Sequence, residues 1–373
     1  MTIKELNEKY NTNIPEILKP EEIGNPELWE KEGRARLKEV LQREEYGMMP
    51  LYDNKNTTFN VKLEEKVLAM DAWRKEIDIT TTIGDKTHTF TAYMFTPLGA
   101  TNVPMFLYIN RFEWMRRCVF RGTIGQRFPL ETIMKRGYGL IFFCTDDISS
   151  EMLDTGVDYR EGLHNTLGID ENSDTNLGSI GLWSFAAMRI MDYLETDPIA
   201  DSKRVAVVGH SRLGKTALLT GAFDERFAMT ISNDSGAGGA ALFKTKVGEH
   251  VDYMVETIPY WFCNNYKKYN NAEDKMPFDQ HYLLALAAPR LLYVASAELD
   301  EWSDPNAEFA AASLASEVYE KVYGIKGLIA DEFPALDTPK QDGNIAYHVR
   351  TGPHNILKYD WESFMDFADK HFK

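Results

Sequence analysis

Four residues lie along the chain in an order that could perform nucleophilic catalysis. Ser211 lies in residues 204–219 (RVAVVGHSRLGKTALL), Asp234 and Asp300 follow it, and His354 comes last. A serine hydroxyl becomes an effective nucleophile when a histidine removes its proton and a carboxylate orients that histidine. Serine, acid and histidine follow one another in this order in a large group of enzymes built on a mostly parallel sheet. The sequence therefore predicts a serine nucleophile and a histidine base, and chain order leaves both aspartates open as the acid.

The residues around Ser211 predict a strand, a tight turn and a helix. A β-branched apolar run precedes the serine, and helix-forming residues follow it. Such an elbow lifts the serine oxygen above the sheet and points the first amides of the helix at the reacting oxygen. Gly209 and Gly214 would let strand and helix pass where a Cβ would collide. The spacing is G-x-S-x-x-G and not the commoner G-x-S-x-G, so an incidental serine in an ordinary strand–helix connection is the alternative interpretation.

His354 is the histidine best placed to act as the base. Only His354 and His371 follow the last predicted strand, and His371 lies on the terminal helix. His210 precedes the serine, but we expect its side chain to leave the turn in another direction. His164 falls in a polar passage and is expected to be a surface residue.

Arg212 directly follows the serine at the start of the predicted helix. Arginine keeps its proton at working pH, so it cannot be the base, but it suits a developing negative oxygen. The alternative is that Arg212 pairs with a surface carboxylate.

The elements that must position these residues alternate between strand and helix. Short apolar runs predict buried strands at residues 103–109, 139–144, 227–232, 289–297 and 346–350. Intervening helices predict an α/β fold of the α/β-hydrolase type, a three-layer sandwich with a mostly parallel sheet. Residues 60–97 alternate in character around Gly84-Asp85, which predicts antiparallel strands at the N-terminal edge.

One domain over residues 1–373 is expected, because no linker or repeat interrupts the chain. Residues 1–58 predict a helical extension, and the polar residues 145–177 predict a lid or rim insertion. An aromatic stretch predicts either the wall of a cleft or a cover of the core, and its rings are Tyr260, Trp261, Phe262 and Tyr266.

Composition excludes several classes of partner. The net charge of −16 disfavours nucleic acid and anionic membranes. Cys118, Cys144 and Cys263 are odd in number and widely spaced, so they predict neither a disulfide framework nor a zinc site. The first residues lack the features of a signal peptide and no run reaches transmembrane length, so we expect a cytoplasmic protein, or a secreted one if a leader has been removed.

Several segments resemble the glucuronoyl esterases of carbohydrate esterase family 15, including bacterial members often labelled acetyl xylan esterases. They are GHSRLGK, NDSGAGGAAL, YWFCNNYKKYN, PFDQHYLLALAAPRLLYVASAELDEWSDP and GPHN. The resemblance covers roughly residues 90–373, and its most specific part is G-x-S-R-x-G-K. It implies an α/β-hydrolase fold, no metal or other cofactor, and cleavage of the ester between glucuronic acid on xylan and an alcohol of lignin.

The resemblance also implies roles for individual residues. Ser211 would be the nucleophile and His354 the base. Arg212 would stabilise the oxyanion through its backbone amide and guanidinium, Lys215 would bind a hydroxyl of the uronate, and Trp302 would contact the sugar.

The resemblance does not decide the acid outright. Fungal members carry glutamate where this chain has Asp234, whereas some bacterial members use a carboxylate after a later strand, which matches Asp300. Asp234 is one methylene shorter than that glutamate, and the loop of Asp300 also carries Trp302. We therefore favour Asp300 as the partner of His354, with Asp234 as a second carboxylate.

These inferences predict a serine esterase that cleaves a 4-O-methyl-glucuronoyl ester of xylan or xylo-oligosaccharides through an acyl-enzyme. The runner-up is an acetyl xylan esterase or oligosaccharide deacetylase, which needs the same triad but no cation for a uronate ring. A sugar-binding pseudoenzyme is the remote alternative.

Overall fold

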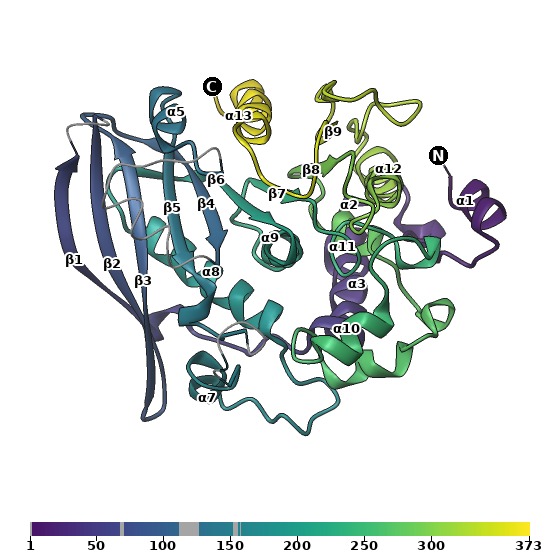
Figure 1. Cartoon of the computed structure of the whole chain (residues 1–373), viewed down its shortest axis with the longest axis horizontal. Coiled ribbons are helices and arrows are strands. Elements are labelled where there is room, and N and C mark those ends of the chain that lie inside the picture. The colour runs from purple at the N-terminus through teal and green to yellow at the C-terminus, as the bar shows by residue number, and fades with distance from the viewer. Residues whose placement is uncertain (1, 68–70, 112–126, 152–155, 157) are drawn as a thin grey trace.

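The computed structural model describes residues 2–67, 71–111, 127–151, 156 and 158–373. Over these residues one nine-stranded sheet runs in the order β1-β2-β3-β5-β4-β6-β7-β8-β9 (Figure 1). The strands are β1 (Thr57–Val67), β2 (Ala72–Ile83), β3 (Lys86–Pro97), β4 (Val103–Asn110), β5 (Gly139–Cys144), β6 (Ala200–His210), β7 (Met229–Asn233), β8 (Leu291–Ala297) and β9 (Ile345–Arg350).

The sheet is parallel wherever the candidate catalytic residues are attached. Strands β5, β4, β6, β7, β8 and β9 pair in parallel, whereas β1, β2 and β3 are antiparallel and join the sheet through an antiparallel pairing of β3 with β5. The predicted class, with antiparallel strands at the N-terminal edge, is confirmed. Carboxyl ends of neighbouring parallel strands meet at one edge, so the loops after β6, β7, β8 and β9 converge there.

Both faces of the sheet are buried along the parallel strands β4, β5, β7, β8 and β9. On β4, Leu107 and Ile109 belong to one apolar cluster, while Phe106 and Tyr108 between them belong to a second cluster on the opposite face. Figure 1 shows α5 (Leu130–Lys135) and α13 (Lys358–Phe372) over one face. The other face carries α8 (Ser179–Leu194), α9 (Arg212–Phe223), α11 (His281–Ala285) and α12 (Pro305–Lys321). The three layers confirm the predicted sandwich.

The N-terminal residues are helical and pack beneath α11. They contain α1 (Ile3–Tyr10), α2 (Pro26–Leu28) and α3 (Arg34–Leu41), and two π-helical segments, η2 (Trp29–Gly33) and η3 (Gln42–Tyr46), flank α3. The Arg34 guanidinium donates to the carbonyl of Leu286 at 2.6 Å, and His281 Nε2 lies 2.9 Å from the carbonyl oxygen of Pro15 in the N-terminal segment. These contacts tie the extension to the body of the sandwich.

In the described part of residues 145–177 there are a 3₁₀ turn, η6 (Thr145–Asp147), and one short α-helix, α7 (Leu163–Leu167). The expectation that His164 is a surface residue is wrong, because its ring is buried edge to face against Tyr159 with centroids 5.7 Å apart. That the passage acts as a lid stays a prediction.

The remaining short helix, α10 (Val251–Thr257), lies beside the aromatic stretch. Cys144 and Cys263 are buried thiols, and Cys118 lies outside the described residues. Within the described part of the chain, no helix has both the length and the apolar character that crossing a membrane requires.

Candidate active site

Ser211 occupies a strained turn between β6 and α9. Its backbone has φ 60° and ψ −132°, a combination that side-chain-bearing residues rarely adopt. Its amide donates to the carbonyl of Asn233, the last residue of the neighbouring strand β7, at 2.8 Å. The serine therefore sits at the first turn of α9, where the predicted elbow places it.

The two glycines of the motif are steric requirements. A Cβ at Gly209 would lie 1.8 Å from the carbonyl oxygen of Leu213, and one at Gly214 would lie 2.8 Å from Cβ of Ser235. Either contact would push α9 away from the sheet, which confirms the reason given for glycine at both positions.

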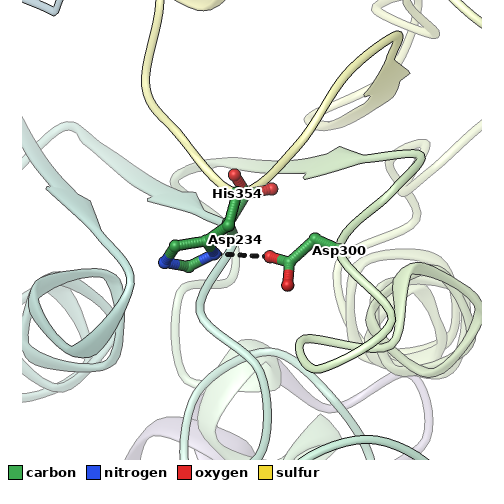
Figure 2. A group of neighbouring side chains, drawn as sticks. All are labelled: Asp234, Asp300 and His354. Atoms are coloured by element: carbon green, nitrogen blue, oxygen red, sulfur yellow. Dashed lines mark hydrogen bonds and ion pairs between the residues drawn. The ribbon is translucent and has the colours of Figure 1, made fainter.

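His354 and Asp300 form a direct hydrogen bond. His354 Nδ1 lies 2.5 Å from Asp300 Oδ2, and Figure 2 shows the carboxylate facing the edge of the imidazole. Asp300 is buried after β8, whereas 39% of the His354 side chain is exposed in the loop after β9. Burial disfavours ionisation of Asp300, but hydrogen bonds from His354 and from Ser303 outweigh it and hold the pKa of the carboxyl below its usual value. Asp300 is therefore ionised against the imidazole.

Asp234 lies nearby in a different role. Its carboxylate is buried, and Oδ2 accepts the amide of Asn355 at 3.1 Å and contacts Arg350 Nη2 at 3.5 Å. Figure 2 draws no bond from it to the imidazole of His354. Burial first, and the neighbouring carboxylate of Glu308 next, raise the pKa of Asp234 well above its usual value. Asp234 thus supports the loop that carries His354.

Among the described residues, Asp234, Asp300 and His354 also form a group whose spacing suits a metal ion. One ligand atom each from Asp234, Asp300 and His354 lies within 4.8 Å of the others. The 2.5 Å contact between Asp300 and His354 is a hydrogen bond, so a cation there would compete with the proton on Nδ1.

All seven residues singled out from the sequence line one cavity of about 350 Å³. The structure brings Ser211, Arg212, Lys215, Asp234, Asp300, Trp302 and His354 together with Ser235, Glu249, Tyr253, Trp261 and Ser303. The loops after four parallel strands supply them, as expected where carboxyl ends of strands converge.

The guanidinium of Arg212 is fixed on two sides. It pairs with the carboxylate of Glu151 and lies over the ring of Trp261, with Cζ 4.9 Å from the ring centroid. Glu151 is buried and also accepts Arg111 Nε at 2.9 Å and Trp261 Nε1 at 3.1 Å. The alternative of a surface carboxylate is wrong, because this partner is buried in the wall of the site.

Lys215 is almost fully buried beside the cavity. Its ammonium lies 2.5 Å from Glu249 Oε2 and donates to the carbonyl of Ala237. Trp302 is half exposed and meets Tyr253 edge to face at 5.1 Å. A charged pair and an aromatic pair therefore line the same cavity.

Sequence reasoning missed several of these neighbours. Glu151, Glu249 and Tyr253 belong to no motif, and each reaches the site from a loop or short helix distant in sequence. Of the aromatic stretch, Trp261 lines the cavity, whereas Phe262 and Tyr266 stack on each other in the core at 4.4 Å. Both interpretations of that stretch therefore hold, each for different rings.

A second cavity, of about 180 Å³, also borders the serine. It shares Ser211, Arg212 and His354 with the larger one and adds Tyr108, Asn110, Arg111, Arg127, His210 and Leu213. Cleavage of an ester needs room for an acyl part and for an alcohol part at the nucleophile. Both cavities border Ser211 and His354, so the site offers two spaces next to the nucleophile, which suits acyl transfer.

Comparisons with known proteins agree with this chemistry. A family profile described as "Glucuronyl esterase, fungi" matches residues 79–323. Carbohydrate esterase MZ0003, from an unknown prokaryotic organism, is 34% identical over 380 residues, covering 94% of this chain and 86% of that protein. The 4-O-methyl-glucuronoyl methylesterase 1 of Wolfiporia cocos (strain MD-104) is 33% identical over 195 residues, which are 49% of this chain and 46% of the fungal protein.

A solved structure is similar over nearly the whole chain. The glucuronoyl esterase from Solibacter usitatus superimposes with a TM-score of 0.88 at 34% identity, covering 97% of this chain and 98% of that one. The similarity therefore includes the sheet and the loops that build the cavity, and it extends beyond the segments that the fungal relatives share.

Proposed function

The chain belongs to the glucuronoyl esterases of carbohydrate esterase family 15, and from this membership we propose that it hydrolyses a 4-O-methyl-glucuronoyl ester on xylan or xylo-oligosaccharides. One observation carries the proposal. Ser211, in its strained turn, borders the same cavity as the hydrogen-bonded pair of His354 and Asp300.

The reaction is a double displacement at the ester carbonyl. His354 takes the proton of the Ser211 hydroxyl as the serine oxygen attacks the carbonyl carbon, and Asp300 holds the imidazolium that forms. His354 then gives this proton to the departing alcohol, which leaves an acyl-enzyme. A water molecule, deprotonated by the same imidazole, releases the uronate and restores the serine.

Arg212 serves the negative oxygen that develops in each tetrahedral intermediate. Its amide is at the first position of α9, and its guanidinium is held beside the serine by Glu151 and Trp261. A preorganised donor of this kind lowers the barrier because it needs no rearrangement as the charge forms.

The larger cavity supports a sugar acid as the acyl part. The paired charges of Lys215 and Glu249 offer a donor and an acceptor for ring hydroxyls, and Trp302 offers an apolar ring face. An acetyl group would use none of these groups, so no observation in the site favours the deacetylase alternative.

Turnover of a benzyl glucuronate ester compared with an acetylated xylo-oligosaccharide tests the proposal. We expect the glucuronate ester to be hydrolysed far faster by the wild type and not by Ser211→Ala. Preference for the acetylated oligosaccharide would select the deacetylase. Failure of Ser211 to react with a fluorophosphonate probe would instead point to the pseudoenzyme.

A further inference from the structure

His210, the last residue of β6, packs against the candidate base. The ring centroids of His210 and His354 are 4.5 Å apart, with planes inclined at 39°. The side chain of His210 is 10% exposed, and its Nδ1 lies 2.7 Å from Asn233 Oδ1 and 4.0 Å from Asp234 Oδ2. The sequence led us to expect that this side chain leaves the turn in another direction. That expectation is wrong, because the ring lies beside His354.

The hydrogen bond to Asp300 leaves the imidazole of His354 under-constrained. Among the described residues, the imidazole makes one side-chain hydrogen bond, from Nδ1 to Asp300 Oδ2, which fixes one ring atom and lets the ring tilt about that contact. The His354 backbone is well held, because Arg350 donates to the carbonyls of Pro353 at 2.9 Å and of Asn355. The remaining freedom is in the side chain, of which 39% is exposed.

We propose that His210 is a positioning residue that holds the ring of His354 in the orientation in which it can exchange a proton with Ser211. This inference rests on the proposed function, since it assigns His354 as the base. The packed ring of His210 supplies the second contact that limits the tilt of the imidazole.

Asn233 links this contact to the nucleophile. Its backbone carbonyl accepts the amide of Ser211 at 2.8 Å, its side chain contacts the ring of His210, and His210 and Asn233 are register partners in the pairing of β6 with β7. Asn233 therefore positions Ser211 through its backbone carbonyl and the ring of His210 through its side chain. The last residue of β7 is thus connected to the nucleophile directly and to the base through the ring of His210.

The charge state of His210 suits this task. Burial first, then the neighbouring His354, lower the pKa of His210 to about 3, against the opposing effects of Asn233 and Asp300. A neutral ring can stay packed on His354 when the base becomes an imidazolium during the reaction, whereas a second imidazolium would repel it.

Two substitutions separate the ring contact from mere folding. His210→Ala removes the ring, and His210→Phe keeps an aromatic ring of similar outline. We expect His210→Ala to lower kcat on a glucuronate ester about 100-fold, the cost of a misplacement near 1 Å, with KM little changed. His210→Phe should recover most of that loss. His281→Ala is the matched control, because His281 is also buried with one ring nitrogen bonded to a carbonyl, and it lines neither cavity.

Two further measurements do not depend on the substrate. The rate at which a fluorophosphonate labels Ser211 should fall in His210→Ala and recover in His210→Phe. The downfield NMR signal of the proton between His354 and Asp300 should broaden in His210→Ala and remain in His210→Phe. The proposal would be overturned if His210→Ala kept the kcat, the labelling rate and the NMR signal of the wild type. It would also be overturned if His210→Phe were no better than His210→Ala. If the wild type leaves glucuronate esters intact, the proposed function fails, and the labelling and NMR results still decide the role of His210.

Discussion

The carboxylate of Asp300 lies 2.5 Å from Nδ1 of His354, across 54 residues of sequence. Asp234 also follows a parallel strand and lies beside the same loop, but its carboxylate accepts the amide of Asn355 and contacts the guanidinium of Arg350. Chain order treats these two aspartates alike, and the contact supports the choice of Asp300 as the acid.

Substitution of each aspartate by asparagine tests that choice. Asp300→Asn should lower kcat by about 10⁴-fold, because an amide in place of the carboxylate leaves the imidazole in the wrong tautomer. Asp234→Asn should cost much less kcat and should instead lower the melting temperature, since it loosens the loop of His354. Steady-state kinetics and thermal unfolding of both variants measure this. An inactive Asp234→Asn with a fully active Asp300→Asn would reverse the assignment.

The serine and its base should act as one unit. Ser211→Ala and His354→Ala should each lower kcat by several orders of magnitude, and the double variant should be little worse than either. The test is a double-mutant cycle on a glucuronate ester. Losses that multiply would mean that the two residues act independently.

Glu151 should matter to the reaction through Arg212. Arg212→Ala should lower kcat by about 10²–10³-fold, as expected when an oxyanion donor is removed. Glu151→Gln should also lower kcat, because the guanidinium of Arg212 loses the buried carboxylate that holds it in place. In the double variant the loss should be no greater than in Arg212→Ala alone. Additive losses would show that Glu151 acts by another route.

Lys215 should contribute to substrate binding more than to the chemical step. Lys215→Met should raise KM for a glucuronate ester with a smaller change in kcat, and it should leave an acetate ester unaffected. Lys215→Met alone leaves the buried carboxylate of Glu249 without its cation, which lowers stability. The double variant Lys215→Met/Glu249→Gln removes that buried charge as well and is therefore the control. Equal effects on both esters would remove Lys215 from the uronate site.

Glu45 should make the protein less stable as the pH rises. Burial raises the pKa of Glu45 to about 8, although both its oxygens accept Gln280 Nε2, at 2.9 and 3.0 Å. The unfolded chain releases this proton near its ordinary pKa of 4.5, so stability is lost as the pH rises from there towards 8. Glu45→Gln has no charge to bury, and its melting temperature relative to wild type should increase from pH 5 to pH 8. The gain should reach about 1 kcal/mol or more at pH 8, and a difference that is constant with pH would contradict the explanation.

The sequence by itself determined the features that depend on neighbouring residues. Alternating and continuous apolar runs predicted the strands, because side-chain period follows backbone geometry over a few residues. The glycines at 209 and 214 predicted the elbow, because a close approach of strand and helix excludes a Cβ. Ser211 and His354 could be chosen because each lies where a strand has just ended.

Only the tertiary structure decided which side chains meet. Glu151 reaches Arg212 across 61 residues, and Asp300 rather than Asp234 turns toward His354. His210 was expected to point away from the site, and its ring packs on His354, which comes from the loop after β9. These contacts depend on the directions of side chains in loops that converge from distant parts of the chain, and the local pattern of residues carries no record of those directions.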